Sequence, residues 1–168
     1  GMNFLWQGQS CGSTSRVLGH DGLYDRFVDG VVARVQQVRL GDPMAPDSTM
    51  GPINSKGQYE KVLGYIEIAK QDGARLVAGG KRPDGSAFAR GFWVEPTVFA
   101  DVTPGMRIAQ EEVFGPILSI MRWSDPDEVI AMANGIEYGL TASIWTRDLH
   151  TALRTTRRLD AGYIWVNG

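Results

Sequence analysis

The chain has 168 residues, of which 43% are apolar and 21% are charged, and this composition is ordinary for a globular domain. Its net charge of −2 gives no reason to expect a nucleic acid or an anionic membrane surface as a partner. No apolar stretch is long enough to span a bilayer, and no basic segment followed by an apolar one indicates a signal peptide. A single cysteine, Cys11, and two distant histidines exclude a disulfide framework and predict no metal site. We therefore expect a cytoplasmic protein.

The first half of the chain predicts two helices, followed by short strands. Both helices have apolar residues at nearly helical spacing and a glycine or proline beyond their ends, and they are expected over residues 22–38 and 55–70. A short strand is expected next, over residues 75–78. Residues 92–99 are rich in β-forming side chains but contain Pro96, which favours an edge strand or an irregular one.

The second half of the chain alternates regularly between strands and helices. Residues 117–123 have the pattern of a buried strand, and a serine, an aspartate and a proline follow as a helix start. The remaining elements are expected to be a helix over 127–134, a strand over 142–146, a helix over 148–159 and a strand over 163–166. Such alternation predicts a parallel sheet. We expect an α/β fold with an open, mostly parallel sheet and helices on both faces.

Cys11 lies in the sequence Gly-Gln-Ser-Cys-Gly, which occupies residues 8–12. The small flanking residues would let a substrate approach the thiol, and polar neighbours of this kind are unusual around a core cysteine. If a helix begins just after Cys11, its free N–H groups would favour a thiolate and a developing oxyanion. Taken alone, this segment leaves two interpretations open, a buried structural cysteine and a nucleophile.

Several motifs, in order along the whole chain, resemble the aldehyde dehydrogenase family. The Gly-Gln-Ser-Cys sequence, with Arg16 five residues beyond the cysteine, is similar to the family's nucleophile signature. The Glu-Glu-Val-Phe-Gly-Pro sequence, which alone would indicate only a solvated loop, resembles the second signature. Other motifs in the family order are Met-Gly-Pro at 50–52, Gly-Phe and Pro-Thr within 91–97, Asn and Tyr-Gly-Leu within 134–140, and Gly and Trp-Val-Asn within 162–167. Residues 2–4 and 12–16 look closest to betaine-aldehyde-dehydrogenase-like members, whereas Trp6 stands where many members have asparagine.

The resemblance implies an NAD(P)-dependent aldehyde dehydrogenase in which Cys11 is the catalytic nucleophile. Its thiolate would add to the aldehyde carbon, hydride loss would give a thioester, and the Cys11 backbone N–H would supply half of the oxyanion hole. Glu112 would accept hydrogen bonds from the hydroxyls of the nicotinamide ribose. Phe114 would pack beside the nicotinamide end of the cofactor, which is NAD or NADP.

The resemblance also implies what this chain lacks. Residues 1–168 correspond to the cysteine-bearing catalytic domain, and we expect the cofactor-binding domain, the general-base glutamate, the oxyanion-hole asparagine and the C-terminal oligomerisation segment to be absent. The parent enzyme would oxidise a small aldehyde to a carboxylic acid, while the isolated chain would bind no cofactor and be inactive. The alternatives are a catalytically inactive truncated module and a thiol hydrolase, although no base lies near Cys11 in sequence. Uncovered apolar faces predict a homodimer or higher self-association.

Overall fold

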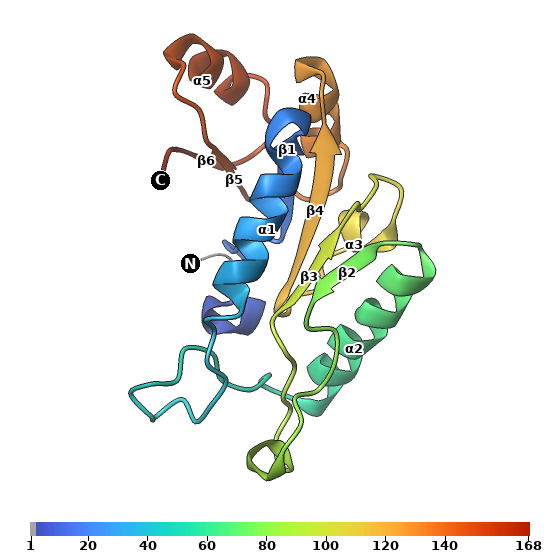
Figure 1. Ribbon diagram of the computed structural model, residues 1–168. Coiled ribbons are helices and arrows are strands. Elements are labelled where there is room, and N and C mark those ends of the chain that lie inside the picture. The colour runs from blue at the N-terminus through green and yellow to red at the C-terminus, as the bar shows by residue number, and fades with distance from the viewer. Residues whose placement is uncertain (1–2) are drawn as a thin grey trace.

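The structure, a computed structural model, describes residues 3–168, so Met2, which belongs to one of the family-like motifs, lies outside the described residues. Over this range the main sheet has the strand order β1-β4-β3-β2 (Figure 1). Its strands are β1 (Arg16–His20), β2 (Arg75–Ala78), β3 (Thr97–Ala100) and β4 (Ile117–Trp123). β4 pairs in parallel with β1 and β3, while β2 runs antiparallel to β3. The prediction of a mostly parallel α/β sheet is confirmed.

Helices cover both faces of this sheet, as predicted. The α-helices are α1 (Tyr24–Val35), α2 (Lys56–Gln71), α3 (Arg107–Gln110), α4 (Pro126–Asn134) and α5 (Leu149–Thr156). Successive residues of β4 point to opposite faces, so this central strand contributes to two cores. Leu118 and Ile120 join the cluster under α1, whereas Ile117 and Met121 join the cluster under α2 and α3.

The last two strands lie apart from the main sheet. β5 (Thr141–Ile144) and β6 (Tyr163–Val166) pair in parallel with each other, connected through α5. Arg158, which follows α5, ties this unit to α4 through an ion pair with Asp127 and through its carbonyl, which accepts from Asn134 Nδ2 at 2.8 Å. The strand–helix alternation correctly predicts parallel pairing of these neighbours, but it does not specify their separation from β4.

The strand around Pro96 differs from the prediction. β3 begins only at Thr97 and lies between β4 and β2 with all four residues buried, so the edge alternative is wrong. The other alternative, an irregular strand, agrees with the register shift in its pairing with β2. The proline is tolerated beside an interior strand because it precedes the first residue that needs a ladder hydrogen bond. The Thr97 N–H donates to the Pro116 carbonyl at 2.8 Å, where pairing with β4 starts. The edge position belongs to β2 instead.

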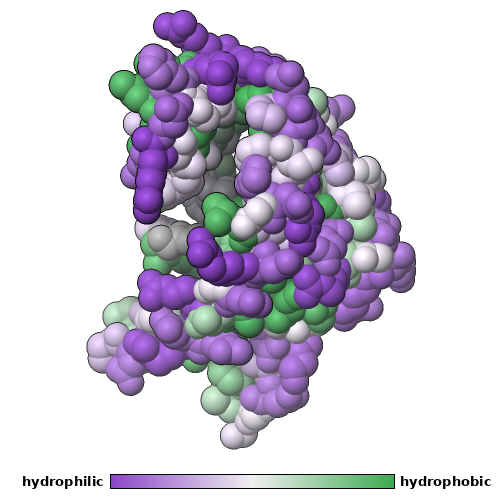
Figure 2. Space-filling view, turned by 45° about the horizontal axis from the view of Figure 1, so that its top comes forward, coloured by the Kyte–Doolittle hydropathy of each residue, from purple (hydrophilic) through white to green (hydrophobic). Residues whose placement is uncertain are grey.

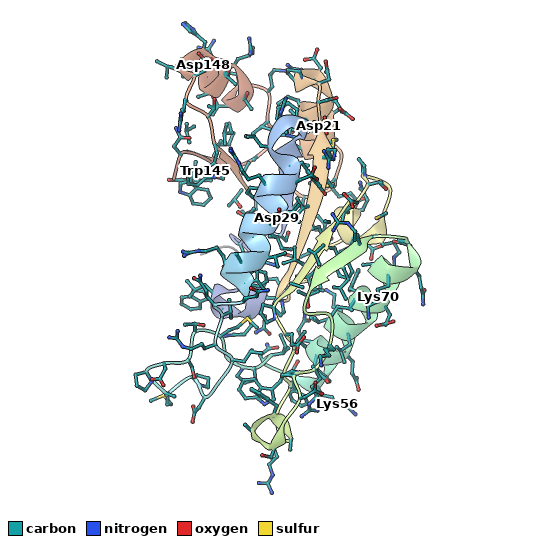
Figure 3. All side chains as sticks on the ribbon, in the orientation of Figure 1. Asp21, Asp29, Lys56, Lys70, Trp145 and Asp148 are labelled. Carbon is teal, nitrogen blue, oxygen red and sulfur yellow. The ribbon has the colours of Figure 1, made fainter. Side chains whose placement is uncertain are left out.

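The surface is largely polar. Figure 2 shows polar residues over most of one face, interrupted by small apolar groups and by a hollow. Large exposed apolar side chains gather around β5, β6 and α5, and they include Leu140, Trp145, Leu149, Leu153, Tyr163 and Trp165; Figure 3 shows Trp145 beside β5. Within residues 3–168, no helix is long and apolar enough to cross a membrane, and no cluster of three or more His, Cys, Asp or Glu could hold a metal ion.

A buried tyrosine joins the first helix to the centre of the sheet. The Tyr24 hydroxyl donates to the Ile120 carbonyl at 3.1 Å and accepts from the Asp101 N–H at 2.7 Å. We expect Tyr24→Phe to lower the free energy of unfolding by about 1–3 kcal/mol, because both backbone groups lose their partner away from water. Urea unfolding measures this loss. The control is Tyr138→Phe, at a ring 52% exposed; an equally small effect of both changes would contradict the bridging role of Tyr24.

Candidate active site

Cys11 is exposed and lies in a turn between a 3-10 segment at Leu5–Gly8 and β1. The Ser13 N–H donates to the Ser10 carbonyl at 3.0 Å and closes this turn. No helix begins after the cysteine, since the chain enters β1 instead, so the condition for stabilisation of a thiolate by a helix N-terminus is not met. The thiol is therefore accessible, but no helix N-terminus stabilises its anion.

β1 was not predicted from the sequence, because this strand is short and contains Gly19. Its apolar residues Val17 and Leu18 pack into the two opposite cores, which is the alternation of a strand. Two such residues are too few to distinguish a strand from a loop in the sequence. β1 nonetheless anchors the cysteine turn, because Ser119 of β4 donates its N–H to the Ser15 carbonyl at 2.9 Å.

The segment that ends in Cys11 packs against residues 111–116, here called the EEVFGP loop. Gly8 has a φ of +66°, and a Cβ atom at this position would lie only 1.9 Å from the carbonyl oxygen of Gly115. Only a glycine permits such an approach between the two backbones. Buried Asn3 reinforces it by donating from Nδ2 to the same Gly115 carbonyl at 2.9 Å. The two segments that resemble family signatures are thus joined in space.

Trp6 lies in the same left-handed stretch as Gly8. Its φ is +66° and its side chain is 69% exposed. Asparagine adopts this backbone region several times more readily than most residues, which agrees with the asparagine that the resemblance implies at this position. The exposed indole therefore occupies a position that a smaller polar side chain would suit.

Both residues assigned to the cofactor lie on the EEVFGP loop, which is held by α2. Lys61 Nζ donates to the Glu112 carbonyl at 2.9 Å, and Gln58 Nε2 donates to the Phe114 carbonyl at 2.8 Å. Glu112 is exposed, and within the described part of the chain its carboxylate has no hydrogen bond or ion pair. Phe114 is half-buried and has a φ of +56°. A free carboxylate and an aromatic ring therefore lie two residues apart on a fixed backbone.

The other acid of the loop, Glu111, is fully engaged. Arg107 donates from Nε and Nη2 to its two carboxylate oxygens at 2.8 Å each, and the Tyr65 hydroxyl donates to one of them. These hydrogen bonds, first that of Arg107 and then that of Tyr65, lower the pKa of Glu111 to about 2. Burial and the same carboxylate raise the pKa of Tyr65. Glu111 therefore anchors the loop to α2 and α3 and leaves Glu112 as its available carboxylate.

We expect the depressed pKa of Glu111 to contribute to acid sensitivity. The stabilisation is present above the usual glutamate pKa near 4.5 and is lost as the pH falls towards about 2. Glu111→Gln should therefore lower stability near neutral pH and flatten the decrease in unfolding free energy over that window. Urea unfolding at a series of pH values measures the slope, and Glu67→Gln, on the exposed side of α2 beside Lys70, is the control. An unchanged slope in Glu111→Gln would refute the anchoring role.

Arg16 connects the cysteine region to α4. Its guanidinium donates to the carbonyls of Met132 and Ala133, at 2.6 Å and 3.4 Å, in the last turn of that helix. A cation is favourable there because the helix C-terminus carries partial negative charge. Burial lowers the pKa of Arg16, and its Nε has no hydrogen-bond partner among the described residues. The arginine of the first signature thus has a structural contact that sequence reasoning could not assign.

A third family-like motif, at residues 50–52, reaches the same region. The Gln9 side chain accepts the N–H of Asn54 at 3.2 Å. The side-chain oxygen of Gln7 accepts the N–H of Gly51 at 3.1 Å. Gln9 belongs to the first motif, but its contact with Asn54 is not visible in the sequence. Gln58 and Lys61 could not be recognised as site residues, because a glutamine or lysine on a polar surface carries no pattern of its own.

Comparison with known proteins gives the same family along the whole chain. A model of the aldehyde dehydrogenase family matches residues 1–168. An aldehyde dehydrogenase of Talaromyces stipitatus is 52% identical over 171 residues, which cover 99% of this chain and 33% of that protein. A betaine aldehyde dehydrogenase of Mesorhizobium japonicum is 50% identical over 165 residues, covering 98% of this chain and 34% of that protein. The chain therefore spans about a third of the length of these curated relatives.

Solved structures agree in fold. The betaine aldehyde dehydrogenase of Staphylococcus aureus in complex with NAD+ superposes with a TM-score of 0.95 at 35% identity, covering 99% of this chain and 33% of that one. The Mycobacterium tuberculosis aldehyde dehydrogenase complexed with NAD+ gives a TM-score of 0.94 at 39% identity, covering 98% of this chain and 34% of that one. By sequence and by fold, this chain belongs to the aldehyde dehydrogenase family.

Proposed function

We propose that this chain is the cysteine-bearing catalytic part of an NAD-dependent aldehyde dehydrogenase that oxidises an aldehyde to a carboxylic acid. The packing of Gly8 against Gly115 carries the proposal, since it joins the segment of the exposed Cys11 to the loop of Glu112 and Phe114. The names of the relatives and the NAD+ in two similar structures support the reaction and the cofactor.

Cys11 acts as the nucleophile in this proposal. Its thiolate adds to the carbonyl carbon of the aldehyde, and its backbone N–H donates to the oxygen as that atom gains negative charge. NAD, when bound, supplies the acceptor for the hydride that the same carbon loses. The thioester left on Cys11 is then open to hydrolysis, because a thiolate is a good leaving group. The exposed turn gives both the aldehyde and the hydrolytic water access to the sulfur.

Glu112 and Phe114 fit a nicotinamide ribose on chemical grounds. The exposed Glu112 carboxylate, which is unpaired over residues 3–168, can accept hydrogen bonds from two vicinal hydroxyls. The half-buried ring of Phe114 offers an apolar face to a planar heterocycle. In this proposal the two residues bind and orient the cofactor, and Glu111 takes no part because Arg107 and Tyr65 occupy its carboxylate.

The test replaces the matching third of the Mesorhizobium japonicum betaine aldehyde dehydrogenase with residues 1–168, giving a hybrid enzyme. We expect the hybrid to reduce NAD+ in the presence of betaine aldehyde, with the unaltered Mesorhizobium enzyme as the positive control. The isolated 168-residue chain should give no turnover, because contacts from Glu112 and Phe114 alone do not offset the freedom a cofactor loses on binding. A folded hybrid without turnover would contradict the proposal, as would full turnover by the isolated chain.

The exposed apolar side chains around β5, β6 and α5 favour a second candidate, an inactive module that self-associates. They include two well-exposed aromatic residues, Trp145, which is 72% exposed, and Tyr163, which is 58% exposed. Burial of such a surface against a second copy would remove it from water, and a two-fold dimer is the commonest closed arrangement. Light scattering coupled to size exclusion should then give a dimer for the isolated chain and a monomer for a Trp145→Ser, Tyr163→Ser variant. A monomer at every concentration would exclude this candidate.

A further inference from the structure

Phe114 holds a backbone conformation that an aromatic residue rarely adopts. Its φ of +56° lies in the left-handed region, where the Cβ atom crowds the following carbonyl. Such a conformation persists only where the surrounding structure stabilises it, and such residues cluster at functional sites. The group that stabilises this conformation of Phe114 lies outside the EEVFGP loop.

That group is the side-chain amide of Gln58. Its Nε2 atom donates to the Val113 carbonyl at 2.9 Å and to the Phe114 carbonyl at 2.8 Å, which uses both of its N–H groups. In an extended chain, successive carbonyls point to opposite sides, so one nitrogen could not reach both. The amide therefore binds the curled conformation of Phe114 and not an extended one.

Gln58 is itself fixed within the first turn of α2. Its backbone N–H donates to the hydroxyl of the helix-capping Ser55 at 3.3 Å. Lys61 and Val62, three and four residues later, lie on the same side of the helix, where Lys61 binds the Glu112 carbonyl and Val62 packs on Gly115. One face of a sixteen-residue helix thus holds the loop over four consecutive residues.

We propose that Gln58 is a positioning residue for the cofactor contacts. By holding Phe114 in the left-handed conformation, its amide sets the direction of the Phe114 ring and of the Glu112 carboxylate. This inference rests on the proposed function, because it assumes that these two side chains contact NAD. The role of Gln58 is confined to the loop backbone, so its loss affects cofactor affinity more than the chemistry at Cys11.

The decisive variant is Gln58→Glu, which has nearly the same shape but presents only acceptors to two carbonyl oxygens. Gln58→Lys retains a donor and should partly restore function, while Gln71→Glu, at the exposed far end of α2, is the matched control. In the hybrid enzyme we expect Gln58→Glu to raise the KM for NAD+ about tenfold. We expect kcat and the KM for the aldehyde to change by less than about threefold, since neither depends on cofactor affinity.

A second readout uses the isolated chain and needs no activity. Chymotrypsin should cut the 168-residue chain after Phe114 about tenfold faster in Gln58→Glu than in Gln71→Glu, because the loop opens more often. Unchanged cleavage and an unchanged KM for NAD+ would overturn the proposal, as would a fall in kcat alone. If Glu112→Ala and Phe114→Ala leave the KM for NAD+ unaltered, the proposed function of these residues fails. Cleavage after Phe114 then still decides whether Gln58 holds the loop.

Discussion

Replacing Cys11 with serine should lower kcat/KM of the hybrid enzyme for its aldehyde at least about a thousandfold. A serine hydroxyl is a weak nucleophile unless a base removes its proton, and an alkoxide leaves an ester less readily than a thiolate leaves a thioester. Both halves of the proposed reaction therefore depend on sulfur. Stopped-flow measurement of NAD+ reduction gives the rate of thioester formation, and steady-state measurement gives the rate of the complete reaction, including hydrolysis.

Stability should not change with Cys11→Ser, because the side chain is exposed and makes no hydrogen bond in the described part of the chain. Unfolding in urea separates this effect from misfolding. Thr14→Ala, at an exposed position three residues away, is the matched control and should retain full activity. A Cys11→Ser hybrid that keeps a tenth or more of wild-type activity would show that another group is the nucleophile.

The largest effect on stability is expected for Gly8→Ala. The new methyl group would meet the Gly115 carbonyl at 1.9 Å, and the residue would have to keep a φ of +66°. The atom in the way belongs to the backbone and cannot rotate aside. We expect a loss of roughly 2–4 kcal/mol in the free energy of unfolding, from backbone strain together with separation of the cysteine segment from the EEVFGP loop.

Gly12→Ala is the control for this substitution. Gly12 is also next to the cysteine turn, but a Cβ atom there would have nothing within 4 Å. Its free energy of unfolding should stay within about 0.5 kcal/mol of the wild type. Urea unfolding of both variants gives the comparison, and equal losses would mean that the contact between Gly8 and Gly115 is not what fixes this region.

Most of the helices and strands could be predicted from the sequence, including the four-residue strands β2 and β6, whereas β1 and α3 could not. α1, α2 and β4 agree with their predicted ranges to within a few residues, because apolar side chains repeat over several turns or fill a whole strand. β1 has only five residues, one of them a glycine, so its sequence shows neither the apolar spacing of a helix nor the alternation of a strand. The interior position of β3 and the separation of β5 and β6 depend on pairing between distant segments, which local patterns do not encode.

The candidate site, too, has features that the sequence predicts and contacts that it does not. Its residue types and its polar turn can be read from the sequence, and the family resemblance suggests roles for Cys11, Glu112 and Phe114. The contact of Gly8 with Gly115 and the hold of Gln58 on the EEVFGP loop join residues that are far apart along the chain. Such contacts exist only once the sheet and α2 have formed. They explain why these glycines and this glutamine matter.

The most direct measurement is the identification of the acylated residue during turnover. The hybrid enzyme is mixed with NAD+ and betaine aldehyde, quenched in acid within milliseconds, digested and analysed by mass spectrometry. We expect the acyl group of the acid product on the peptide that contains Cys11, with loss of the adduct after hydroxylamine treatment, as a thioester requires. An adduct on any other residue, or steady turnover without an acyl group on Cys11 at any quench time, would contradict the account.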